Sequence, residues 1–248
     1  MGWTEYLAGF HRDHAGVTAQ VLGVSRDRLG HTPYEWLAAA AARGRVLDVA
    51  CGNAPWWSPA VDRRYVGLDE SLRELALAQR AGASSLLRAS AVAIPVATSS
   101  VDVVTCSMAL MILSPPPTVL SEIRRVLVPG GILVATVPAT SPLRAGDTVV
   151  AAGLLAALGR PLRYPNDALL ADLPRMLTRA GLELVADERR RFEYPLTTSA
   201  AADLLVSSLY LPALSATRYR AARAYLRTVA RVGVEFPVPI RRIVAVAR

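Results

Sequence analysis

The chain of 248 residues contains no lysine, so all 28 of its basic residues are arginine. Cysteine is almost as scarce, with only Cys51 and Cys106. Two cysteines cannot build a disulfide scaffold, and these two lack the paired spacing of a zinc site. The sequence therefore predicts a protein of the reducing cytoplasm, with no metal centre.

Long apolar runs are also missing. The longest, residues 149–158, is about ten residues and includes Gly153, which indicates a buried helix and not a membrane span. The first residues, 1–5, lack the basic and apolar regions of a signal peptide. A hydrophobic share of 52% with 19% charged residues is typical of a globular protein, and we expect no association with a membrane.

Charge is unevenly spread along the chain. Residues 1–188 carry 17 arginines and 17 acids, whereas residues 189–248 carry 11 arginines and three acids. The whole net charge of +8 therefore lies at the carboxyl-terminal end. Any electrostatic binding surface is expected there.

Short apolar segments alternate with helical patterns along most of the chain. Strands are predicted at 46–50, 65–69, 85–89, 101–107, 132–138, 182–192 and 243–247. Helices are predicted at 3–29, 32–42, 71–81, 117–126, 147–158, 167–180 and within 198–232. Strands separated by helices of about ten residues indicate βαβ units, and hence a parallel sheet with right-handed crossovers.

Two acids follow two of these strands. Asp48 lies near the end of the first strand, before a tight turn at 51–54, and Asp69 ends the second strand. Acids at the carboxyl ends of adjacent parallel strands suit a nucleoside-bearing cofactor. The turn lets the backbone approach the ligand, and the second carboxylate can accept hydrogen bonds from both ribose hydroxyls.

Residues 48–54, Asp-Val-Ala-Cys-Gly-Asn-Ala, resemble motif I of the class I S-adenosylmethionine-dependent methyltransferases, usually Asp-x-Gly-x-Gly-x-Gly. Four later segments agree with the family pattern in the same order: 65–71, 87–91, 94–104 and 122–131. The alternative is another doubly wound nucleotide-binding protein, such as a dehydrogenase. That class does not account for the Arg-Val-Leu-Val-Pro-Gly-Gly segment at 125–131.

The resemblance implies an α/β fold: a doubly wound, mostly parallel, seven-stranded sheet with an antiparallel last strand. It also implies four parts. They are an N-terminal helical lid at 1–44, a Rossmann-like core at 45–192, a helical insertion at 193–240 and the last core strand at 241–248.

The cofactor implied by the resemblance is S-adenosylmethionine. Its expected contacts are Asp48, Ala50, Cys51, Gly52, Asp69, Glu70, Ser90, Ala91 and Cys106. Ser90 stands where the family often has an aspartate that binds the adenine amino group. Ala50 and Ala54 replace glycine, which would permit a positive φ, and alanine is the mildest replacement only where the torsions are ordinary.

The expected function is in-line transfer of the sulfonium methyl group to a small-molecule acceptor, driven mainly by proximity and alignment in a dry pocket. Such catalysis needs no prominent catalytic residue, although His11 or His14 in the lid could remove a proton from the acceptor. Two alternatives remain open. One is a ribosomal RNA base methyltransferase that uses the helical stripe of Arg220, Arg223, Arg227 and Arg231. The other is a cofactor-binding protein without transferase activity. The sequence leaves the oligomeric state open.

Overall fold

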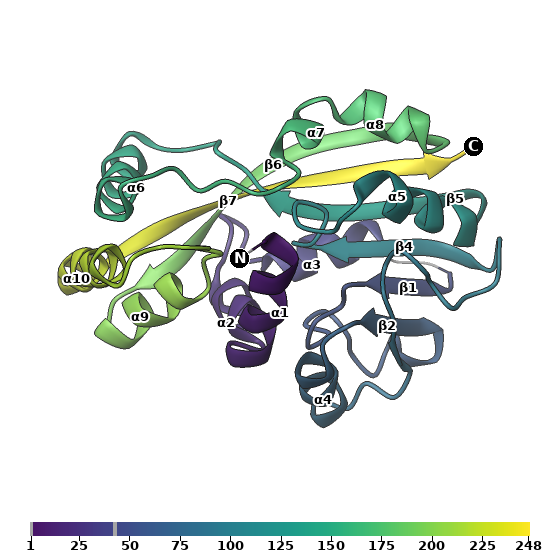
Figure 1. Cartoon of the computed structure of the whole chain (residues 1–248), viewed down its shortest axis with the longest axis horizontal. Coiled ribbons are helices and arrows are strands. Elements are labelled where there is room, and N and C mark those ends of the chain that lie inside the picture. The colour runs from purple at the N-terminus through teal and green to yellow at the C-terminus, as the bar shows by residue number, and fades with distance from the viewer. Residues whose placement is uncertain (1, 42–43) are drawn as a thin grey trace. The chain divides into compact units, whose positions relative to one another are not determined.

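A computed structural model describes residues 2–41 and 44–248 (Figure 1). The chain divides into two compact units. The first, here called the helical unit, comprises Met1–Pro33, Ala139–Arg163 and Arg190–Ile240. The second, here called the sheet unit, comprises Tyr34–Pro138, Tyr164–Arg189 and Arg241–Arg248.

The strands form one seven-stranded sheet in the order β3-β2-β1-β4-β5-β7-β6. Neighbours among the first five strands are parallel, and β7 runs antiparallel, which confirms the predicted fold class (Figure 1). The strands are β1 (Val46–Val49), β2 (Tyr65–Asp69), β3 (Leu86–Arg88), β4 (Val101–Ser107), β5 (Leu127–Pro138), β6 (Leu182–Leu196) and β7 (Val234–Ala247). All four residues of β1 are buried, as expected for a central parallel strand.

The sheet unit contains most of α3 (Pro33–Ala40), the short 3-10 helix η1 (Asp62–Arg64), α4 (Leu72–Arg80), α5 (Pro116–Val126), α7 (Asp167–Ala171) and α8 (Leu173–Arg179). The helical unit contains α1 (Trp3–Asp13), α2 (Val17–Val24), α6 (Ala145–Leu158), α9 (Ser199–Ser207) and α10 (Ala216–Val232). Within the described ranges, no helix combines the length and apolar character needed to cross a membrane.

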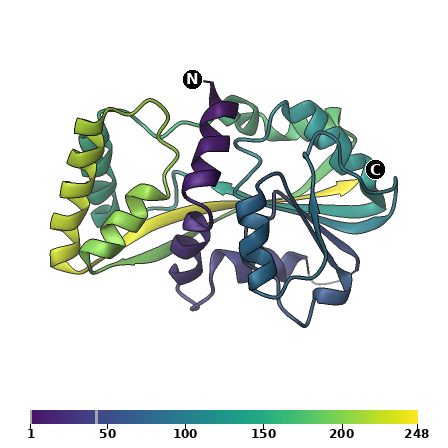
Figure 2. The same ribbon diagram turned by 60° about the horizontal axis from the view of Figure 1, so that its bottom comes forward.

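The helical unit has its own apolar core, in which α10 packs along α6 and against α9 (Figure 2). The Ser215 hydroxyl caps α10 by accepting the Arg218 N–H at 3.3 Å. Ala222 and Leu226 of α10 are fully buried in this core, with Tyr219 packed at its edge.

Several predicted boundaries were wrong. The Pro-Gly-Gly segment at 129–131 lies within β5 as an irregularity, since the pairing of β4 with β5 shifts between Val101 and Val103. A side chain at Gly131 would come within 2.9 Å of the Val128 carbonyl oxygen, so glycine is needed there.

The bounds of β6 and β7 also differ from those predicted. β6 continues to Leu196 and β7 begins at Val234, so the insertion between them contains only α9 and α10. The predicted helix at 167–180 is divided at Asp172, because Pro174 lies in the first turn of α8 and cannot donate a backbone hydrogen bond. The predicted end of the second helix at residue 42 lies outside the described residues. The division into lid, core and insertion stays a prediction.

Candidate cofactor-binding site

The turn after β1 has an unusual backbone. Ala50, Gly52 and Ala54 all have left-handed torsions, with φ values of 54°, 55° and 53°. A side chain in this region costs an L-residue roughly 1–2 kcal/mol relative to a right-handed conformation. The torsions are therefore not ordinary, and the two alanines keep the backbone of a glycine turn at an energetic cost.

The Asp69 carboxylate links this turn to the start of α4 through hydrogen bonds. Its Oδ2 accepts the Gly52 N–H at 2.8 Å and its Oδ1 accepts the Ser71 N–H at 2.8 Å. The Cys51 N–H also donates to the Leu68 carbonyl oxygen at 3.0 Å. The Asp69 carboxylate is half-buried, and an ionised carboxylate has about four acceptor positions, so it can also accept hydroxyl donors from a ligand.

Asp48 faces the interior and is fully buried. Its Oδ2 accepts the Trp56 indole N–H at 3.0 Å and the Tyr65 hydroxyl at 2.8 Å, and its Oδ1 accepts the Thr105 hydroxyl at 2.6 Å. Burial raises its pKa to about 6, while the three donors act in the opposite direction. These contacts make Asp48 an internal anchor of the turn; its contact with the cofactor stays a prediction.

The two cysteines are buried at the same end of the sheet. Cys51 lies two residues after the end of β1, and Cys106 lies in the adjacent strand β4. Burial raises the pKa of both thiols well above the ordinary range. Both are therefore protonated thiols, and neither is prepared to act as a nucleophile.

The remaining predicted contacts follow β2 and β3. Glu70 is exposed beside Asp69, and Ala91 is buried after β3. Ser90 is half-buried, and it follows Ala89, whose N–H donates to the Asp69 carbonyl oxygen at 3.2 Å. The structure thus brings the predicted residues of four strands to one edge of the sheet, the carboxyl ends of β1 to β4.

The two histidine candidates lie in α1 of the helical unit. His11 Nε2 is 3.3 Å from the Tyr210 hydroxyl oxygen, and the His14 ring lies 5.3 Å from the Phe10 ring centroid. Their role as a proton acceptor stays a prediction.

Several buried side chains whose hydrogen bonds stabilise this part of the sheet unit could not be predicted from the sequence. Trp56 was visible only as an aromatic residue near the motif, and nothing in the sequence linked Thr105 to Asp48. Asn166 is likewise buried, and its Nδ2 donates to the Leu110 and Leu113 carbonyl oxygens, each at 2.7 Å. Contacts across 57 and 56 positions of sequence carry no local signal.

The edge fits an adenosine-type group. A half-buried carboxylate lies beside a turn whose backbone is open, since a methyl group at Gly52 would meet nothing closer than Glu74, at 3.7 Å. The position matches the place where doubly wound sheets bind nucleotides, outside the carboxyl ends of the strands. The fold and the edge together define a Rossmann-like nucleotide-cofactor-binding protein.

Comparison with known proteins narrows this class. Residues 47–135 match the family model described as a methyltransferase domain. A search of curated proteins found no match. Among solved structures, the chain is similar to the YcgJ protein of Bacillus subtilis, with a TM-score of 0.57, 17% identity, and coverage of 87% of this chain and 97% of that one.

Two further structures share the fold. One is a Haemonchus contortus phosphoethanolamine N-methyltransferase 2 in complex with phosphomonomethylethanolamine and S-adenosylhomocysteine, with a TM-score of 0.56, 14% identity, and coverage of 100% of this chain and 60% of that one. The other is the [4+2]-cyclase SpnF, with a TM-score of 0.53, 21% identity, and coverage of 88% and 82%. The fold alone therefore does not fix the reaction.

The matched domain contains the turn after β1, Asp69 and Cys106. Residues 47–135 are therefore assigned to a methyltransferase domain, and S-adenosylmethionine is the cofactor.

Proposed function

We propose that this methyltransferase modifies a small molecule with an apolar body, and that the acceptor binds a pocket in the helical unit. The pocket has a volume of about 580 Å³, within the range of roughly 300–1,000 Å³ typical of small-molecule sites. It is formed by α1, the end of α9, the loop that follows, and the start of α10. This pocket is the observation that carries the proposal.

The lining combines apolar and polar groups. Phe10, Val206 and Leu211 are buried and supply apolar surface. Glu5, His14 and Arg220 are exposed on its polar side. An acceptor with an apolar body and one polar end suits this lining, because apolar contacts supply affinity and a few polar groups fix orientation.

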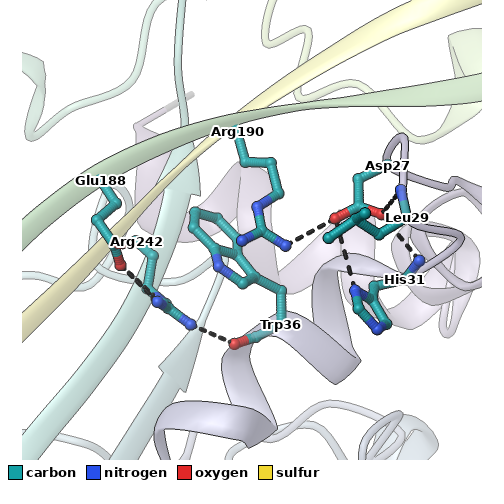
Figure 3. A network of polar contacts seen from close by, with 7 residues as sticks. All are labelled: Asp27, Leu29, His31, Trp36, Glu188, Arg190 and Arg242. Carbon is teal, nitrogen blue, oxygen red and sulfur yellow. Dashed lines mark hydrogen bonds and ion pairs between the residues drawn. The ribbon is translucent and has the colours of Figure 1, made fainter.

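The RNA alternative is weakened by the pairing of the arginines. Eight of the eleven arginines after residue 188 form ion pairs with carboxylates. Several of these carboxylates belong to residues 1–188, where positive and negative charges balance. In the helical unit Arg190 donates to Asp27 at 2.7 Å, and in the sheet unit Arg242 pairs with Glu188 and donates to the Trp36 carbonyl oxygen (Figure 3). These ion pairs offset much of the positive charge that would attract a phosphate backbone.

The predicted arginine stripe of α10 is likewise half neutralised. Arg223 and Arg227 both donate to Asp203 of α9, at distances between 2.5 and 3.0 Å. Their two guanidinium groups hold the pKa of Asp203 well below its usual range. Only Arg220 and Arg231 of the stripe make no ion pair with the described acids, too few for a strong phosphate-binding surface.

S-adenosylmethionine supplies an electrophilic methyl group on its sulfonium. In this proposal the edge around Asp69 binds and orients the cofactor, and the apolar lining excludes water from the acceptor. Methyl transfer can be catalysed mainly by positioning, and His14 in the pocket is available to take a proton from the acceptor.

Phe10→Trp tests the proposal, because a larger ring at this lining residue fills the pocket and leaves every residue of the sheet unit unchanged. Methyl-labelled S-adenosylmethionine is incubated with a low-molecular-weight metabolite extract and, separately, with total RNA. We expect label in the small-molecule fraction and at least about tenfold less in Phe10→Trp, with unchanged affinity for S-adenosylhomocysteine. Phe236→Trp is the matched control, since Phe236 is buried in the helical unit but does not line the pocket.

Label in RNA would favour the RNA enzyme. Cofactor binding with no label in either fraction would favour a cofactor-binding protein without transferase activity.

A further inference from the structure

Residues 48–56 form a closed segment. After Asp48 the chain leaves β1 at Val49 and passes through the left-handed residues Ala50, Gly52 and Ala54. It returns with Trp56, whose indole N–H donates to Asp48 Oδ2 at 3.0 Å. Both ends of the segment are buried, because Asp48 is fully inaccessible and Trp56 is only 9% exposed. The turn that faces the cofactor is therefore fixed at both ends by one hydrogen bond.

The bond itself is held in place from two sides. The Trp56 ring packs edge-to-face on Tyr65, with centroids 5.1 Å apart and an interplanar angle of 79°. Tyr65 donates to the same carboxylate oxygen as Trp56, and Thr105 donates to the other oxygen. A carboxylate with three donors and no solvent contact has a single well-defined orientation.

The left-handed torsions of Ala50 and Ala54 need the support of the hydrogen bond between Trp56 and Asp48. A glycine turn adopts left-handed torsions without steric cost, whereas Ala50 and Ala54 adopt them only where the surroundings impose them. Backbone bonds to Leu68 and Asp69 hold the middle of the turn at Cys51 and Gly52, and a further bond joins the Ala54 N–H to the Cys51 carbonyl oxygen at 2.9 Å. The Trp57 N–H also donates to the Ala54 carbonyl oxygen at 3.1 Å, and the Trp56 side chain adds the bond that closes the segment onto Asp48.

We propose that Trp56 is a positioning residue for the cofactor: its hydrogen bond to Asp48 imposes the left-handed backbone that glycine would adopt freely at positions 50 and 54. This inference rests on the cofactor assignment and is independent of the acceptor. It also explains how the chain can bind S-adenosylmethionine with a single glycine in its motif I turn.

Trp56→Phe tests the proposal, because it removes the indole N–H and keeps an aromatic ring against Tyr65. We expect the affinity for S-adenosylhomocysteine, measured by calorimetry, to fall about tenfold, the size expected for a lost bond to a charged group. In the Ala50→Gly/Ala54→Gly background, the same substitution should reduce affinity less than about threefold, because glycine does not need the anchor. A purely structural role for Trp56 would give the same loss in both backgrounds.

Trp57→Phe is the matched control. Trp57 is the next residue, and its indole N–H donates to Asp62 Oδ1 at 2.9 Å, outside the closed segment. It should lower the free energy of unfolding without changing cofactor affinity in either background. The proposal is overturned if Trp56→Phe leaves affinity unchanged in a folded protein, or if the glycine background fails to reduce its effect. Titration with S-adenosylhomocysteine requires no acceptor, so either result leaves the small-molecule proposal standing.

Discussion

The Gly52 backbone N–H donates to Asp69 Oδ2 at 2.8 Å and joins the turns that follow two adjacent parallel strands. The other carboxylate oxygen accepts the Ser71 N–H, which lies at the start of α4. Asp69 therefore shapes the cofactor turn through the backbone, and it is also the residue that we predict to accept hydrogen bonds from the ribose hydroxyls. The site is preorganised by the residue expected to bind the ligand.

The adenine end of the site is tested at Ser90. This side chain is half-buried after β3, and its hydroxyl oxygen lies 3.5 Å from the Val92 backbone nitrogen. Ser90→Asp should leave the affinity for S-adenosylhomocysteine equal or higher, because a carboxylate is a stronger acceptor for an exocyclic amine. Calorimetry checks this, and a large loss of affinity would mean that adenine is held elsewhere.

Asp48 predicts a specific pH dependence of stability. Its pKa is raised from 3.8 to about 6 in the folded protein, chiefly by burial. The folded state therefore holds this proton more tightly than the unfolded chain, so its contribution to stability is present below pH 4 and is lost as the pH rises through 6. Asp48→Asn cannot titrate and should gain about 2–3 kcal/mol over the wild type between pH 4 and pH 8.

Urea unfolding of both proteins at these two pH values measures this difference. The same difference at both values would contradict the raised pKa of Asp48. If Asp48 acts as an anchor of the turn, Asp48→Asn should retain cofactor affinity, because an amide oxygen can still accept from Trp56. A lost affinity would instead support contact between the carboxylate and the cofactor's ammonium group.

Nucleic-acid binding should be weak. With Arg223 and Arg227 paired to Asp203, only Arg220 and Arg231 of the stripe remain for phosphates, which predicts a log–log salt slope no steeper than about −1.4 on single-stranded RNA. Fluorescence anisotropy over a salt series measures the slope. Micromolar or tighter affinity at physiological salt, with a slope near −3 that disappears when all four arginines become glutamine, would favour an RNA substrate.

The sequence predicted the parallel strands and the edge where their carboxyl ends meet, because both depend on local patterns. Apolar segments alternating with helical patterns located β1 to β4, and acids at the carboxyl ends of β1 and β2 marked the edge. The sequence could not predict the left-handed torsions of Ala50 and Ala54, since alanine normally signals an ordinary backbone.

Distant contacts explain the other failures. Thr105 donates a hydrogen bond to Asp48, 57 positions away in the sequence. The arginines of the carboxyl-terminal end pair with acids that lie as many as 163 positions away. Counting charges along the sequence therefore predicted a basic surface that the folded chain largely neutralises. The bounds of β5, β6 and β7 were wrong because strands can continue through irregular or exposed segments once a neighbouring strand is available for pairing.

The most direct test of the cofactor site is the calorimetric affinity of Asp69→Ala for S-adenosylhomocysteine. Each hydrogen bond from a hydroxyl to the carboxylate contributes about 1.5–3 kcal/mol, so loss of two such bonds should weaken binding by at least about a hundredfold. The variant should stay folded, with a lower unfolding temperature, because the Gly52 and Ser71 amides lose their acceptor. Wild-type affinity in the folded variant would contradict the assignment of the cofactor to the edge formed by β1 and β2.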